Sequence, residues 1–118
     1  MTIQNVLASV AVKDLKKARA WYSQLLGRPA ESTPMEGLAE WKFPHGGWLQ
    51  VYEDRERAGG GSCTLAVDDL EPQAQVLRRM GIVAISHSGH AQVRTLMITD
   101  PDGNHLAFAQ ALDASLAA

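Results

Sequence analysis

Two segments of helical periodicity lie among short runs that alternate between apolar and polar residues. The first segment follows Asp14 and repeats apolar residues every three or four positions up to Gly27; the second follows Asp69 and ends at Gly81. Aspartate is a favoured helix N-cap, and glycine accepts the left-handed backbone that ends many helices. The pattern therefore predicts two amphipathic helices, over residues 15–26 and 70–80.

The runs around these helices are rich in β-branched, aromatic and small residues and are bounded by turn residues. They predict strands at 6–12, 30–33, 38–43, 48–53, 62–67, 82–86, 93–99 and 105–110, with a loop at 88–90 and a frayed tail or short helix over 111–118. The strongest turn is Pro101-Asp102-Gly103, because proline presets φ and glycine accepts a positive φ. It predicts a β-hairpin near the C-terminus.

The order of these elements repeats. Pro44–Gly47 recurs as Pro101–Asn104, and Val12–Leu15 recurs as Val67–Leu70 at nearly the same spacing. We therefore expect a single α+β domain over residues 1–118, built from two tandem β-α-β-β-β modules that form a curved mixed sheet around a cleft, with the helices on the outer face. Module 1 covers about 5–53 and module 2 about 62–110, and the glycine-rich stretch 54–61 is predicted to be a flexible linker.

Composition excludes several classes of function. A net charge of −2 gives no electrostatic signature for nucleic acid, and no apolar run approaches the roughly 20 residues of a membrane span. The single cysteine, Cys63, excludes an internal disulfide. We expect a cytoplasmic protein with neither nucleic acid nor membrane as partner.

Strand alternation divides the side chains between two faces. One face is apolar and is predicted to pack beneath the helices, with Cys63 as a buried, inert thiol. The other face mixes small, hydroxyl, amide and aromatic residues: Leu7, Ser9, Ala11, Trp48, Gln50, Tyr52, Ser62, Thr64, Ala66, His105, Ala107 and Ala109. We interpret this face as the lining of a ligand cleft; a partly solvated sheet face or a dimer seam is the alternative.

Three motifs follow one another along the chain: Val12-x-Asp14-Leu15, Trp21-Tyr22-x-x-Leu25-Leu26-Gly27 and Asp100-Pro101-Asp102-Gly103-Asn104. Together with the repeated module, they resemble the vicinal oxygen chelate superfamily, which includes glyoxalase I, the bleomycin-resistance proteins and the extradiol dioxygenases. Family enzymes chelate a divalent metal through His and Glu at four positions, which correspond here to Leu7, Ser62, Gln50 and Ala107. Of these four side chains only Gln50 is a useful ligand. The resemblance therefore implies a protein with no metal or other cofactor, and argues against metal-dependent glyoxalase or dioxygenase activity.

Three functions from different classes remain, and the third is a non-catalytic interaction module that retains only the fold. The first is a homodimeric small-molecule-binding protein, similar to the bleomycin-resistance branch, that holds an aromatic or drug-like ligand among Trp48, Gln50, Tyr52 and Met97. The second is a metal-independent isomerase or lyase that uses Glu40 or His105 as acid or base in the same cleft. A salt bridge from Glu40 to Lys42 or Arg94 is the structural alternative for that carboxylate. The cleft belongs either to one chain or to modules of two chains.

Overall fold

The computed structural model describes residues 2–90 and 93–111, with side chains described up to residue 87 and from residue 93. Two helices and eight strands follow one another in the expected order. Module 1 contains β1 (Leu7–Val12), α1 (Leu15–Leu26), β2 (Ser32–Met35), β3 (Leu38–Lys42) and β4 (Trp48–Glu53). Module 2 contains β5 (Ser62–Val67), α2 (Leu70–Arg79), β6 (Ile85–His90), β7 (Val93–Thr99) and β8 (His105–Ala111).

Both helices begin where their aspartate caps predict. The Asp14 carboxylate accepts a hydrogen bond from the Lys17 amide, and the Asp69 carboxylate accepts one from the Glu71 amide. These bonds satisfy amide groups that have no partner inside the helix. Gly27 follows α1 with a φ of 78°, a left-handed conformation that costs glycine little.

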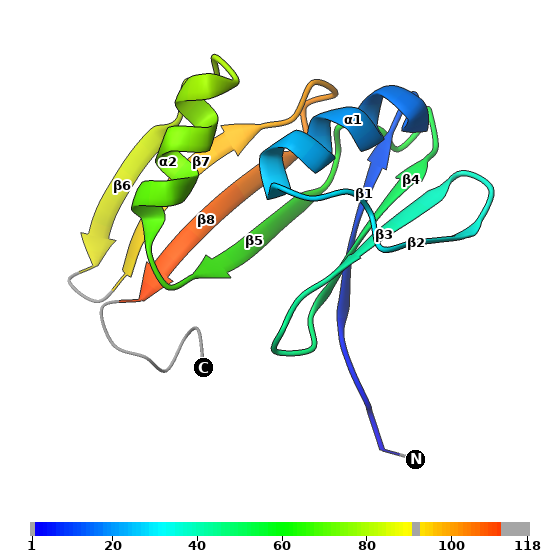
Figure 1. Cartoon of the computed structure of the whole chain (residues 1–118), viewed down its shortest axis with the longest axis horizontal. Coiled ribbons are helices and arrows are strands. Elements are labelled where there is room, and N and C mark those ends of the chain that lie inside the picture. The colour runs from blue at the N-terminus through cyan, green and yellow to red at the C-terminus, as the bar shows by residue number, and fades with distance from the viewer. Residues whose placement is uncertain (1, 91–92, 112–118) are drawn as a thin grey trace.

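The strands form two four-stranded mixed sheets of the same topology, ordered β1-β4-β3-β2 and β5-β8-β7-β6. In each sheet the first and last strands of the module are parallel neighbours, and the other pairs are antiparallel. The sheets lie side by side, with β1 and β5 at their adjoining edges (Figure 1). The α+β, two-module fold class is thus confirmed, and the described strands do not close into a barrel.

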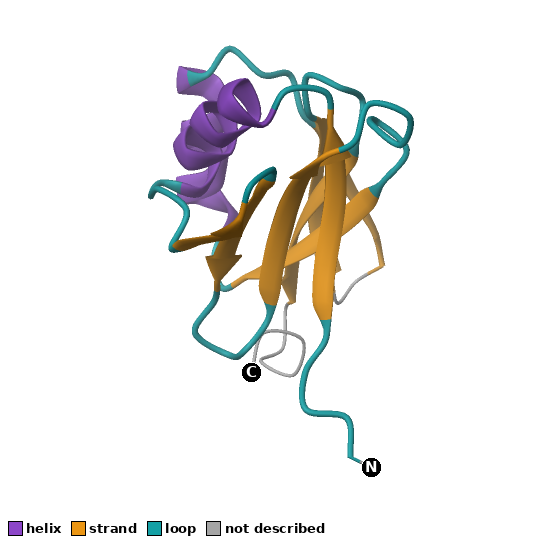
Figure 2. Cartoon of the chain, turned by 90° about the vertical axis from the view of Figure 1, so that its right-hand side faces the viewer, coloured by secondary structure: helices purple, strands orange, loops and turns teal. Residues whose placement is uncertain are grey.

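Both helices cover the same side of the two sheets and leave the opposite faces open (Figure 2). Burial alternates along the strands as the sequence predicts: Leu49 and Val51 are buried beneath α1, while Trp48, Gln50 and Tyr52 are partly exposed on the other side. Ala11, Glu40 and Ala109 are exceptions, because all three belong to the open-face rows and are nevertheless buried. The open faces are the only large sheet surfaces in the described part of the chain that no helix covers.

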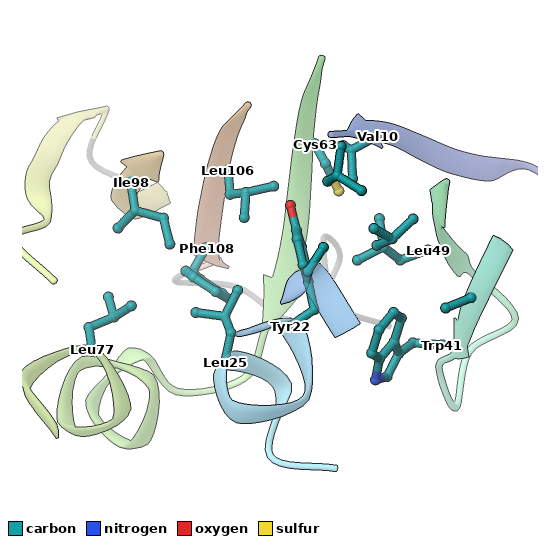
Figure 3. Packing of buried hydrophobic residues seen from close by; sticks show 14 of the residues in the cluster. Val10, Tyr22, Leu25, Trp41, Leu49, Cys63, Leu77, Ile98, Leu106 and Phe108 are labelled. Carbon is teal, nitrogen blue, oxygen red and sulfur yellow. The ribbon is translucent and has the colours of Figure 1, made fainter. Parts of the chain in front are cut away.

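The core is one continuous cluster that draws on both modules. Tyr22 and Leu25 project from α1 between the two sheets, with Phe108 on one side and Trp41 on the other (Figure 3). Burying each large apolar side chain contributes about 1.5–3 kcal/mol, so α1 stabilises module 2 as well as its own module. No described helix is long and apolar enough to cross a membrane.

The Asp100–Asn104 turn joins the two modules through buried hydrogen bonds. Tyr22 Oη donates to Asp100 Oδ2 at 2.6 Å, and Asn104 Nδ2 donates both to Asp100 Oδ2 and to the Ala11 carbonyl at 2.8 Å. Asn104 Oδ1 accepts from the Gly61 amide at 2.9 Å. The motif that carries the family resemblance therefore has a structural role here: it links α1, β1, the connector and the last hairpin.

The connector between the modules is not the free linker that its glycines predict. Asp54 accepts hydrogen bonds from two amides of the following turn, and the Gly59 amide donates to the Ala11 carbonyl. A Cβ on Gly59 would lie 2.2 Å from the Asp102 carbonyl oxygen, so this glycine permits a close backbone approach. Packing against the Asp102 turn, which lies far away in sequence, orders the connector.

The strand predicted at 82–86 begins later in the structure. The Ile82 amide donates to the Leu77 carbonyl and completes the end of α2, so the strand begins only at Ile85 and includes the predicted loop at 88–90. The weak strand predicted at 30–33 likewise lies two residues later, at Ser32–Met35. The part of the predicted tail at 112–118 lies outside the described residues.

Candidate functional site

A row of four polar side chains crosses the open face of module 1. Ser9 Oγ donates to Gln50 Oε1 at 2.9 Å, and Gln50 Nε2 donates to Glu40 Oε2 at 2.7 Å. On the far side, Ser32 Oγ donates to Glu40 Oε1 at 3.0 Å. These bonds connect β1, β4, β3 and β2 in that order, and they fix the orientation of the Gln50 amide. We call Ser9, Gln50, Glu40 and Ser32 the polar row.

Glu40 is the charged member of the polar row and is only 5% exposed. The salt bridge that the sequence allowed with Lys42 or Arg94 does not form: among the described residues, ion pairs join only Arg28 to Glu31, Arg57 to Asp54 and Arg78 to Glu71. The Lys42 ammonium instead lies 4.3 Å from the centre of the Trp48 ring. Glu40 is therefore stabilised by neutral hydrogen-bond donors alone in this part of the structure.

The two aromatic residues beside Gln50 border different hollows. Tyr52 and Ser9 line a hollow of about 390 Å³ whose other wall is the connector, from Glu56 to Gly61. Trp48 lines a second hollow of about 450 Å³, which lies between β1 and β5 and is mostly apolar. Both volumes are large enough for a small organic molecule. The first hollow opens beside the polar row, so it adds an aromatic wall to that site.

The open face of module 2 presents different chemistry at the equivalent positions. Thr64, Ala107, Met97 and Ile85 occupy the row that matches the polar row. Met97 is 45% exposed and Ile85 is 69% exposed. Ser62 pairs with His105 in the next row, and His105 is also exposed. Since Glu40 and His105 lie on different sheets, the structure does not bring the two acid–base candidates together within one row.

Four positions hold the metal ligands in enzymes of the vicinal oxygen chelate superfamily. In this chain the side chains at these positions do not form a set of metal ligands. Leu7 and Ala107 have hydrocarbon side chains that offer no electron pair, and Ser62 offers only a neutral hydroxyl. Gln50 is the one useful ligand of the four, and a single neutral amide oxygen does not make a metal site. Within residues 2–90 and 93–111, no cluster of three or more His, Cys, Asp or Glu side chains is placed to bind an ion. The residues present do not fit the family's metal centre.

Cys63 has the buried position that alternation predicts, on the helix-facing side of β5. Burial raises the pKa of its thiol, because the interior disfavours the thiolate. A protonated, buried thiol is a poor nucleophile, so Cys63 belongs to the packing of the core rather than to the site.

Sequence comparison supplies the family. The glyoxalase-like domain profile matches residues 7–109, which is most of the chain. The chain belongs to the glyoxalase-like family. This assignment confirms the resemblance to the vicinal oxygen chelate superfamily. No curated protein sequence gives a significant match.

Solved structures agree with the assignment. A glyoxalase/bleomycin resistance protein from Catenulispora acidiphila is 34% identical, covers 92% of this chain and 99% of its own, and superposes with a TM-score of 0.83. TnmS3, an antibiotic binding protein from Streptomyces sp. CB03234, shares the fold at 24% identity and a TM-score of 0.79, over 94% of this chain and 98% of its own. The glyoxalase-like fold supports a general role in small-molecule binding.

Ser32 is the member of the site that sequence reasoning missed. It lies on β2, and the pairing of β2 with β3 shifts register between Ser32 and Met35. Counting back from the turn between these strands would place Thr33, not Ser32, opposite Glu40. No local signal in the sequence reveals that shift.

Proposed function

We propose that this glyoxalase-like protein binds a small organic molecule on the open face of module 1, without a metal ion and without making or breaking bonds. The observation that carries the proposal is the polar row on a sheet face that no helix covers. Glu40, Gln50 and their serine partners would fix the ligand's polar groups. Tyr52 would pack against its planar part in the adjoining hollow.

We further propose that the protein is a homodimer in which a second copy closes the open faces. The molecule measures 43 × 42 × 24 Å, and its two sheets lie side by side rather than opposite each other. Exposed Met97 and Ile85 make the open face of module 2 apolar enough to cover a ligand or a partner. A site shared between module 1 of one copy and module 2 of another would include Met97 as a binding residue.

The binding proposal is tested by thermal unfolding against a library of aromatic and drug-like compounds. Ligands that bind the folded state raise Tm. The proposal predicts hits whose Tm shift is lost in Gln50→Ala and Tyr52→Ala but kept in Glu36→Gln, which lies on the exposed turn between β2 and β3. Hits that are indifferent to both site variants, or a library without a single hit, would refute it.

Two further measurements test the proposed dimer and the proposed absence of a metal ion. Sedimentation analysis should give a dimer, and a monomer at all concentrations would contradict the shared site. Metal analysis of protein purified without chelator should find no stoichiometric metal. Nickel, zinc, manganese or iron at one equivalent per chain would overturn the metal-free assignment.

A further inference from the structure

The polar row carries a negative charge that its own neighbours do not balance. Glu40 is a buried carboxylate, and its two side-chain hydrogen bonds within the described residues come from the neutral groups of Ser32 and Gln50. A buried charge is costly to maintain unless an opposite charge compensates it. A carboxylate also has about four acceptor positions, so two donors leave part of its capacity unused.

The cations near this face are engaged elsewhere. Lys42 lies two residues from Glu40 on β3, about 6.8 Å along the strand, and its ammonium is held over the Trp48 ring at 4.3 Å. Arg57, which borders the hollow beside Tyr52, has its Nε 3.9 Å from an Asp54 carboxylate oxygen. Neither cation neutralises Glu40.

The polar row presents acceptors on its exposed side. Gln50 is only partly buried, and its Oε1, which faces Ser9, has a second lone pair after accepting from the Ser9 hydroxyl. Ser9 is exposed, and its Oγ can accept as well as donate. Glu40 lies behind this pair and fixes the orientation of the Gln50 amide. A ligand group that approaches here therefore meets two acceptor oxygens with a negative charge beyond them.

We propose that the open face of module 1 selects ligands that carry a cationic nitrogen, such as a protonated amine, next to an aromatic or apolar body. The nitrogen donates to Gln50 Oε1 and Ser9 Oγ, and the Glu40 carboxylate supplies the compensating charge. The ring packs against Tyr52 in the adjoining hollow. This inference rests on the proposed binding function and adds the chemical class of the ligand.

The test uses matched pairs of probes: arylmethylamines and the corresponding arylmethanols with one, two and three fused rings. Ligand-observed NMR and calorimetry measure both members of each pair at neutral pH. At least one amine should bind about tenfold or more tightly than its alcohol. In Glu40→Gln, which keeps the side-chain size and removes the charge, that preference should fall to about twofold or less. Glu36→Gln makes the same change on an exposed turn and should leave the preference intact.

The outcomes separate the two proposals. Equal binding of amine and alcohol would overturn the cation selectivity while supporting a binding face. A preference that survives in Glu40→Gln would also overturn it, because the charge would then come from another residue. Absence of binding by every probe would overturn the cation selectivity, and library hits insensitive to Gln50→Ala would refute both proposals. Circular dichroism and thermal unfolding establish whether Glu40→Gln is folded. If it is not, the wild type decides: added salt should weaken the binding of the amine more than that of the alcohol, and a preference independent of salt would overturn the cation selectivity.

Discussion

The two modules share one fold, but their open faces differ. At equivalent positions module 1 has the Ser9–Gln50–Glu40 hydrogen-bonded row, and module 2 has Thr64, Ala107 and Met97. The helix-facing rows are mostly apolar in both modules, and both contribute to the buried core. The difference indicates that the helix-facing residues maintain the fold of each module, while the open faces are free to differ in chemistry. The first prediction below tests that division, and the next two compare the turns and the helices of the two modules.

The largest losses of stability should come from truncating equivalent buried leucines on the helix-facing rows of the two modules. Leu49 in β4 and Leu106 in β8 are equivalent, and both are fully buried. Leu49→Ala and Leu106→Ala should each lower the free energy of unfolding by about 2–5 kcal/mol, because each leaves a cavity in the shared core. Urea denaturation measures the free energy of unfolding of both variants.

Thr64→Ala, on the exposed side of β5, serves as the comparison and should change stability by less than about 0.5 kcal/mol. If only one of the two leucine variants were destabilised, the modules would not share a single core. A large effect of Thr64→Ala would contradict the assignment of its face as open.

An intermediate loss of stability should distinguish the hairpin turn of module 2, which contains Asn104, from that of module 1, which contains Gly47. The Asn104 side chain makes three hydrogen bonds: those to Ala11 and Asp100 are buried, and the one to Gly61 is partly buried. Asn104→Ala should cost about 2–4 kcal/mol, because it removes all three bonds and leaves the Gly61 amide without its side-chain acceptor. The equivalent residue of module 1 is Gly47, where an added Cβ meets nothing within 4 Å.

Gly47→Ala is therefore expected to change the denaturation midpoint little, and thermal unfolding of the two variants gives the comparison. Similar losses at both positions would show that the turns contribute equally and that the Asn104 network has no special role in joining the modules.

A smaller, pH-dependent change in stability should appear at the helices. Tyr22 of α1 corresponds to Leu77 of α2, which has no group to ionise. Burial raises the pKa of Tyr22, and its hydrogen bond to Asp100 raises it further. The folded state therefore keeps the phenol protonated while the unfolded chain ionises near pH 10, so stability falls as pH rises above that value. Tyr22→Phe should cost about 1 kcal/mol at pH 7.

That cost should shrink and then reverse above about pH 10, because the phenylalanine variant has no proton to lose at this position. Denaturant titrations from pH 7 to 11 measure the difference between the two proteins. A difference that stays constant over this range would contradict the buried, protonated state of Tyr22.

Local sequence signals predicted the helices, their aspartate caps and the faces of the long strands, because these depend on neighbours within a few positions. They did not predict the ordered connector, which depends on contact between Gly59 and Asp102. They also left the partner of Glu40 open between Lys42 and Arg94, whereas the structure pairs it with Ser32 and Gln50. Strand register decides that pairing, and a one-residue shift in β2 is sufficient to change it.

The central claim is that module 1 provides the ligand-binding face. The most direct measurement is an NMR titration of the isotope-labelled protein with the tightest binder from the compound library, with amide shifts assigned along the chain. We predict that the largest shifts occur in β1, β3 and β4 around Ser9, Glu40 and Gln50. Shifts confined to the strands of module 2, with these three residues unchanged, would contradict the claim.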